Sequence, residues 1–249
     1  MATSGTTTFN PSIDDIIEEA YERTNIRGAR TGYQLKSARR SLNILLSEWG
    51  NRGIHLWKIK LASVPLVEGQ ALYNWTSDTT NFPTDISDVL EAYVRNNTTA
   101  TAPVDTALSK IDRSTYSALP NKLSKGTPSQ YYVQRQAYVR NAAGTITASP
   151  NIYLYTTPSS SFSGANYKVN FYYMAQLEDV GAYTNTSDVI FRFYPALISG
   201  LAYYLSLKYA PDRTQNLKLL YEDELLRAEA ADGSSNSTFV TPKTYYPSV

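Results

Sequence analysis

The stretch TGYQLKSARRSLNILLSEWGNRG, residues 31–53, has the clearest helical pattern of the chain. Its apolar residues recur at helical spacing and would line one side of a helix: Leu35, Ala38, Leu42, Leu45, Leu46 and Trp49. Thr31 and Gln34 have the spacing of a capping box, and Gly50 and Gly53 are typical of a helix end. A stripe of this length must be buried, so the sequence predicts a helix that packs against other helices.

Three further helices are predicted from the two ends of the chain. One covers about residues 12–24, where Ser12 and Asp15 have capping-box spacing. Helical spacing returns from Ser187, and the proline at position 195 fits only in or near a first helical turn. A last helix follows the Pro211-Asp212 turn and ends near Gly233. Because an isolated helix pair cannot bury its apolar stripe, both pairs are expected to form one four-helix bundle.

The region between the helix pairs, from Trp57 to about Tyr183, has the pattern of β-strands. Short alternating runs such as 57–61 and 151–155 are separated by clusters of Pro, Gly, Ser, Thr and Asn, and one short helix is expected near 112–121. The predicted fold is α+β, with a large β-rich domain inserted into the bundle. The expected parts are the N-terminal bundle half, the inserted domain, the C-terminal bundle half and an extended C-terminal arm: residues 1–55, 56–184, 185–233 and 234–249.

The composition excludes several classes of protein. Hydrophobic residues make up 42% of the 249 residues, which is too apolar for a disordered chain. With no cysteine and one histidine, a disulfide framework and a zinc site of clustered histidines or cysteines are excluded, and we expect no metal and no cofactor. The net charge of +1 gives no global attraction to nucleic acid. The 21 tyrosines favour a protein that contacts other proteins.

Targeting signals are not evident in the sequence. Residues 1–12 lack the basic and apolar segments of a secretory signal. The longest apolar stretch, 193–207, is shorter than the roughly 20 residues that a helix needs to span a bilayer. We therefore expect neither signal-peptide export nor direct insertion into a membrane.

Candidate catalytic motifs are incomplete, so no catalytic residue is predicted. The segment 28–33 superficially suggests a phosphate loop but lacks the Lys-Ser/Thr that must follow its second glycine. His55 is not accompanied by a serine nucleophile motif. The acids of the first helix lie opposite its apolar stripe, as on a solvated face: Asp14, Asp15, Glu18, Glu19 and Glu22.

A set of basic residues without intervening acids forms what we call the basic ridge: Arg27, Arg30, Lys36, Arg39 and Arg40. Lys36 and Arg40 share a helical face with Asn43 and Ser47. Two interpretations are open. The ridge could form ion pairs with the acidic face of the first helix or of a neighbouring copy, or it could contact phosphates of double-stranded DNA without reading its sequence.

The tyrosines of the β-region are candidate interface residues. Tyr131 and Tyr132 form one pair, and Tyr153 and Tyr155 alternate in a predicted strand. They could stack on sugars or bases, but tyrosine in strands more often serves sheet packing or subunit contact. We favour packing or subunit contact.

Several segments, in this order, are similar to the head-to-tail adaptor proteins of short-tailed bacteriophages, of the tail tubular protein A type. The segments are FNPSIDDII (9–17), LSEWGNRG (46–53), IDRSTY (111–116), GTPSQYY (126–132), NIYLY (151–155), LAYYL (201–205) and LLYE (219–222). The resemblance implies a non-enzymatic virion protein, assembled in the host cytoplasm, that forms a ring, expected to be a homododecamer, at the phage neck. Such a ring joins the portal protein to the tail nozzle protein, continues the DNA channel and often carries tail fibres.

The last residues are expected to form the extended arm, because prolines at 242 and 247 forbid a helix there. By the same resemblance, this arm is expected to lie extended along a portal subunit or an adjacent adaptor copy. Its apolar residues are the ones expected to dock on the portal: Phe239, Tyr245, Tyr246 and Val249.

Two other functions remain open from the sequence. One is a baseplate or fibre-attachment protein, which is also structural. The other is a tail-associated enzyme that processes polysaccharides, which requires two convergent carboxylates. The β-region offers carboxylates without a recognisable pair: Glu68, Asp78, Asp85, Asp88, Glu91, Asp105, Asp112, Glu178 and Asp179.

Overall fold

The computed structural model describes residues 5–6, 9–53 and 58–232. The chain divides into two compact units. The helical unit combines both ends of the chain, Met1–Glu48 and Asp179–Val249, and the β-unit is the segment between them, Trp49–Glu178. The predicted α+β class, with a β-rich region inserted between two helix pairs that pack together, is confirmed.

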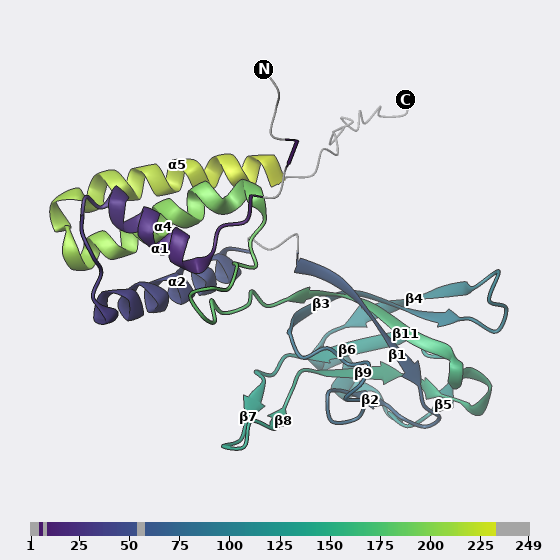
Figure 1. Cartoon of the computed structure of the whole chain (residues 1–249). Coiled ribbons are helices and arrows are strands. Elements are labelled where there is room, and N and C mark those ends of the chain that lie inside the picture. The colour runs from purple at the N-terminus through teal and green to yellow at the C-terminus, as the bar shows by residue number, and fades with distance from the viewer. Residues whose placement is uncertain (1–4, 7–8, 54–57, 233–249) are drawn as a thin grey trace, which may run out of the picture. The chain divides into compact units, whose positions relative to one another are not determined.

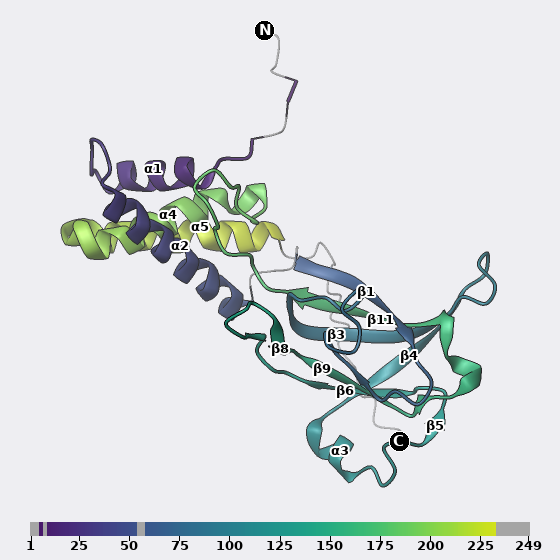
Figure 2. The ribbon, with the colours of Figure 1, turned by 60° about the horizontal axis from the view of Figure 1, so that its bottom comes forward.

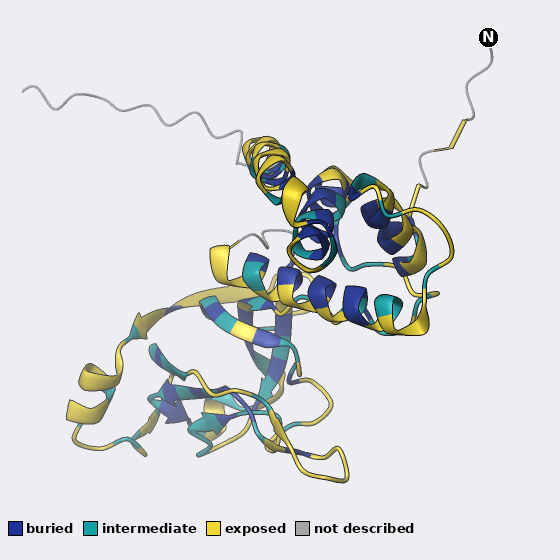
Figure 3. Ribbon diagram, turned by 90° about the vertical axis from the view of Figure 1, so that its left-hand side faces the viewer, coloured by how far each residue is buried: buried dark blue, intermediate teal, exposed yellow. Residues whose placement is uncertain are grey.

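The helical unit is arranged around one central helix. Its helices are α1 (Ile13–Arg23), α2 (Gly32–Arg52), α4 (Tyr194–Tyr209) and α5 (Thr214–Asp232). Figure 3 shows α4 between the other three, with α5 and α2 on either side of it. Buried residues lie around most of α4, which is typical of a helix enclosed by its neighbours.

Both predicted capping boxes are present. The Asp15 N–H donates to Ser12 Oγ at 3.2 Å, and the Ser12 N–H donates to an Asp15 carboxylate oxygen at 2.9 Å. The hydrogen bond from the Ser12 side chain lowers the pKa of Asp15 below its usual value. In the second box, the Thr31 N–H donates to Gln34 Oε1 at 2.9 Å, and the Gln34 N–H donates to Thr31 Oγ1 at 3.3 Å. These bonds fix the beginnings of α1 and α2.

The predicted start of the third long helix at Ser187 is wrong. The α-helix begins at Tyr194, after a short 3₁₀ turn over Phe191–Phe193. The expectation that Pro195 lies in the first turn is confirmed, and it explains the boundary, because a proline lacks the N–H that a later helical position would need. The last helix ends at Asp232, as expected.

A glycine allows α4 to approach α2 and α5 closely. A Cβ atom on Gly200 would lie 2.9 Å from both Leu45 and Tyr221, whereas a Cβ on Gly50 of α2 would meet nothing within 4 Å. Gly200→Ala should therefore lower the free energy of unfolding by about 1–2 kcal/mol, because overpacking outweighs the gain in helix propensity. The matched control Gly50→Ala should raise it by about 0.5 kcal/mol. Urea unfolding of both variants tests this; equal effects would contradict the close packing.

The β-unit contains a seven-stranded sheet in the order β1-β11-β3-β4-β6-β9-β2. Its strands are β1 (Ile59–Leu66), β2 (Leu72–Tyr73), β3 (Ile86–Asn96), β4 (Val104–Ile111), β6 (Gln130–Gln134), β9 (Asn151–Tyr155) and β11 (Gly164–Ala175). All neighbours pair antiparallel except β4 and β6, which are parallel. Two small ribbons accompany the sheet: β5 (Lys125–Gly126) with β10 (Thr157–Pro158), and β7 (Val139–Arg140) with β8 (Ile146–Ala148).

The core of the β-unit lies on one side of this curled sheet. Val64 of β1 and Leu154 of β9, near the two ends of the strand order, belong to the same buried cluster. Phe171 of β11 lies in that cluster and is fully buried. The run 151–155 alternates between this core and the opposite face, as half-buried strands do. In β1 the alternation begins only at Ala62, because residues 59–61 are all exposed.

The short helix α3 (Arg113–Ala118) lies at the periphery of the β-unit (Figure 2). Its N-cap is Asp112, whose carboxylate accepts a hydrogen bond from the Thr115 N–H at 2.6 Å. The helix is shorter than the predicted 112–121, since Leu119 has an extended backbone before Pro120.

Candidate functional site

The residues of the basic ridge are not equally available. Arg27, Lys36 and Arg40 are exposed, and Asn43 and Ser47 are also exposed on α2, as their common face predicts. The structure therefore places Lys36 and Arg40 on the outside of the helical unit.

Arg30 and Arg39 instead pack against tyrosine rings within the helical unit. The Arg30 guanidinium carbon lies 4.7 Å from the centre of the Tyr21 ring, and that of Arg39 lies 4.9 Å from the Tyr183 ring. Arg30 also donates to the Gly28 carbonyl oxygen at 2.6 Å. Both arginines are half-buried. Fewer than five basic residues of the ridge are therefore available to a partner, because Arg30 and Arg39 are engaged in cation–π contacts.

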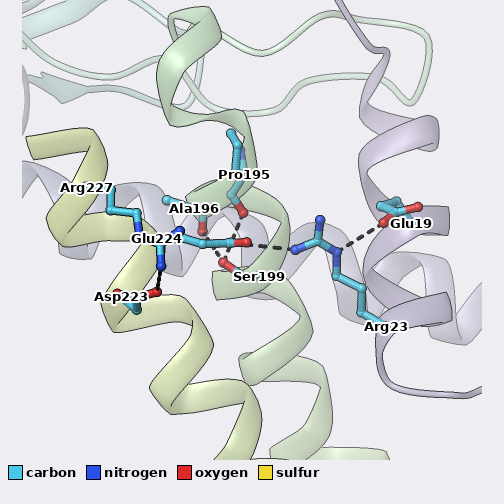
Figure 4. A network of polar contacts seen from close by, with 8 residues as sticks. All are labelled: Glu19, Arg23, Pro195, Ala196, Ser199, Asp223, Glu224 and Arg227. Carbon is cyan, nitrogen blue, oxygen red and sulfur yellow. Dashed lines mark hydrogen bonds and ion pairs between the residues drawn. The ribbon is translucent and has the colours of Figure 1, made fainter. Parts of the chain in front are cut away.

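Among the described residues, no residue of the basic ridge forms an ion pair with the acidic face of α1 in the same copy. Glu19 of α1 pairs instead with Arg23 of the same helix, whose Nε lies 3.0 Å from Glu19 Oε1. Nη1 of Arg23 also lies 3.6 Å from Glu224 Oε2 of α5 (Figure 4). In the same region, the Ser199 hydroxyl of α4 donates to the Pro195 carbonyl oxygen at 2.9 Å. The Arg23–Glu224 pair ties α1 to α5, whereas the other two contacts lie within α1 and within α4.

The acidic face of α1 is exposed to solvent, as expected: Asp14, Asp15, Glu18, Glu19 and Glu22. The buried face of the helix consists of Ile13, Ile16, Ile17, Ala20 and Tyr21. The acids therefore form a surface that a partner could reach.

Tyr131 serves packing rather than subunit contact. Its side chain is fully enclosed in the β-core, and its hydroxyl donates to the Leu90 carbonyl oxygen at 3.0 Å. Burial raises the pKa of the Tyr131 phenol to about 12. An enclosed side chain cannot line an interface, so the expectation that Tyr131 could be an interface residue is wrong.

Tyr132 and Tyr153 form a cluster with Tyr116 of α3, which was not among the candidate interface residues. The ring centre of Tyr116 lies 5.2 Å from that of Tyr132 and 5.3 Å from that of Tyr153. The rings of Tyr132 and Tyr153 stack at 5.8 Å. Tyr132 and Tyr153 lie opposite each other in the register of β6 and β9. The position of Tyr116 depends on the path of the chain after β4, and strand alternation carries no signal for it. Tyr155 is partly exposed.

A row of amides continues from this cluster along the sheet. Gln134 Oε1 accepts hydrogen bonds from the Tyr153 hydroxyl at 3.1 Å and from Asn151 Nδ2 at 3.3 Å. Asn74 Nδ2 donates to Asn151 Oδ1 at 2.9 Å. Because the rings contact one another and the amides are bonded to each other, the cluster holds α3 on the sheet.

Many carboxylates of the β-region have structural partners. Asp88 accepts from Arg135 and Asp105 pairs with Arg95 at 2.7 Å. Asp85 pairs with Lys60 at 2.8 Å. Others pair with Lys125, cap α3 or hold a turn: Glu68, Asp112 and Asp78. Within residues 5–6, 9–53 and 58–232, no group of three or more His, Cys, Asp or Glu side chains could hold a metal ion.

Several expectations lie outside the described residues. These are His55 and the C-terminal arm with Phe239, Tyr245, Tyr246 and Val249. Among the described helices, none has the length and apolar character needed to cross a membrane.

The arrangement defines a class of α+β protein: a helical unit made from both chain ends, with a β-unit inserted between them. The family comparison agrees. The chain matches the model of the SU10 adaptor protein family over residues 5–242, nearly its whole length, and belongs to that family. It is therefore a phage head-to-tail adaptor, a virion protein of a structural family rather than an enzyme family. A comparison with curated proteins gave no match.

Proposed function

We propose that this adaptor assembles into a ring between the portal protein and the tail nozzle protein of a short-tailed phage. The ring continues the channel through which the DNA passes and offers a platform for tail fibres. Membership of the adaptor family, which the match over residues 5–242 establishes, is the observation that carries this proposal.

The surface of the helical unit supports assembly with further protein. Large apolar side chains are exposed on α5, with Leu219 61% and Leu226 63% accessible. These two residues are seven positions apart and therefore lie on one side of the helix. On α2, Ile44 is 51% exposed. Apolar surface of this kind on several helices fits a subunit that is buried further when it assembles.

Purified chain mixed with portal rings tests this function. We expect the chain to co-sediment with the portal rings at an ionic strength near 0.15 M. The absence of co-sedimentation at every ionic strength would contradict the proposed function. The free chain need not form rings by itself, because the portal can act as the template.

No specific feature of the described residues favours a polysaccharide-processing enzyme or a baseplate or fibre-attachment protein. A polysaccharide-processing enzyme would need two free, convergent carboxylates, and Asp85, Asp88 and Asp105 are each paired with a base. Baseplate or fibre attachment would share the same structural chemistry, but the adaptor family favours the neck.

A further inference from the structure

One side of α2 carries a mixed basic and apolar surface. Tyr33 is 72% exposed and Ile44 is 51% exposed, and Lys36 and Arg40 are exposed between them. The spacings of 3, 7 and 11 residues from Tyr33 place all four on one side of the helix. We call this surface the α2 outer stripe. Figure 3 shows exposed residues along α2 on the side away from α4.

The positive charges of this stripe are not neutralised within the helical unit. Neither Lys36 nor Arg40 is in an ion pair with any residue that the structure describes. Two like charges four positions apart on a helix repel each other. A partner that supplies acids would remove this repulsion.

The composition of the stripe favours a protein over DNA. Protein interfaces are enriched in Tyr and Arg, and the stripe contains both. The five exposed acids of α1 belong to the same helical unit and would repel a polyanion. Arg30 and Arg39, which could have widened the positive surface, are packed over tyrosine rings.

The complementary surface lies on α1. Asp15 is engaged in the capping box and Glu19 pairs with Arg23. Among the described residues, Asp14, Glu18 and Glu22 have no basic partner, and they form a row at four-residue spacing that we call the α1 acidic row. Lys36 and Arg40 have the same spacing on α2. Two helices that pack side by side could therefore join both bases to two acids of this row.

We propose that the α2 outer stripe of one copy packs against the α1 acidic row of the next copy in the ring. The contact is heterologous, because it joins two different surfaces, and each copy keeps one of each surface free for a further neighbour. A chain of such contacts closes into a ring when the rotation between copies allows it. This proposal rests on the proposed function and names the partner of the basic ridge as a second copy of this chain.

Charge reversal tests the contact. Lys36→Glu/Arg40→Glu should reduce the amount of chain bound per portal ring at least about tenfold near 0.15 M salt, because acids then face acids. Glu18→Lys/Glu22→Lys should do the same. A chain with all four changes should recover assembly, since the pairs are restored with opposite sign. The matched control Arg213→Glu/Lys218→Glu should assemble like wild type; Arg213 lies directly before α5 and Lys218 near its start, and both are exposed.

Three assembly results would contradict or redirect this contact. Normal assembly of both double variants, or no recovery in the fourfold variant, would exclude the pairing. Normal assembly of the Lys36→Glu/Arg40→Glu variant with impaired genome retention in the virion would assign the stripe to DNA instead. Circular dichroism of each variant distinguishes a lost contact from a lost fold.

A cysteine experiment is independent of the charge changes. Because the chain has no cysteine, Glu18→Cys and Arg40→Cys each introduce a single thiol. After oxidation on portal rings, a mixture of the two chains should give linked dimers, and either chain alone should not. Linkage in neither case would overturn the contact. If the wild-type chain does not bind portal rings, the proposed function fails, and linkage in concentrated solution of the mixed chains still tests the contact.

Discussion

A chain truncated after Gly233 should lose stable attachment to the portal while its thermal unfolding stays unchanged. The removed segment, 234–249, carries three aromatic residues and two prolines, and no helical spacing. Ordering about 16 residues costs roughly 1–2 kcal/mol each in backbone entropy, so the arm needs pockets for its aromatic side chains on a partner. Co-sedimentation with portal rings measures the attachment.

Two further variants sharpen this test of the arm. Replacement of Phe239, Tyr245 and Tyr246 by alanine should weaken attachment nearly as much as the truncation, whereas Ser237→Ala in the same segment should leave it unchanged. Normal attachment of the truncated chain would show that the arm does not dock. A lower unfolding temperature of that chain would show that the segment belongs to the fold of the monomer instead.

Phe171→Ala should destabilise the β-unit by about 3–5 kcal/mol, because a fully buried ring is replaced by a cavity. The ring of Phe171 contacts those of Phe82 and Tyr173, with ring centres 5.9 and 6.0 Å apart. The matched control is its neighbour Tyr172, which points to the other face of the sheet and is 40% exposed. Tyr172→Ala should cost about 1 kcal/mol or less.

Urea unfolding and hydrogen exchange of the β11 amides measure this difference between the two faces of the sheet. We expect faster exchange of β11 in Phe171→Ala than in Tyr172→Ala. Equal losses of stability in both variants would mean that the core does not lie on the side of the sheet that Phe171 occupies.

The helical unit could be predicted from the sequence because its signals are local. Thr31 and Gln34 define the start of α2 by a contact three residues apart, and the stripe from Leu42 to Trp49 identifies its buried side. The close approach at Gly200 is not local in this sense, because it depends on Leu45 of α2 and Tyr221 of α5. The return of helical spacing at Ser187 was misleading, since seven residues precede the α-helix that Pro195 delimits.

The β-unit was predictable as a class but not in its topology. Alternation identifies strands such as 151–155, yet it carries no information on which strand lies beside which. The placement of β11 between β1 and β3, and the parallel pairing of β4 with β6, depend on contacts between residues far apart in the chain. The stacking of Tyr116 on Tyr132 is of the same kind.

For the basic ridge, too, the sequence predicted local features but not contacts with residues far apart in the chain. The sequence identified the charges correctly, and the exposure of Lys36 and Arg40 followed from helical spacing. It could not reveal that Arg39 stacks on Tyr183, because that tyrosine is far away in the chain and reaches α2 only in the folded helical unit. Local periodicity predicts a face, whereas the partner of each side chain is a property of tertiary packing.

A cryo-EM reconstruction of the virion neck tests the central claim most directly. We predict a closed ring of copies of this chain, twelve if the resemblance to dodecameric adaptors extends to symmetry, directly below the portal and around the DNA path. The helical unit of each copy should meet the next through α2 and α1. Density for this chain in fibres or a baseplate, with none between portal and nozzle, would contradict the account.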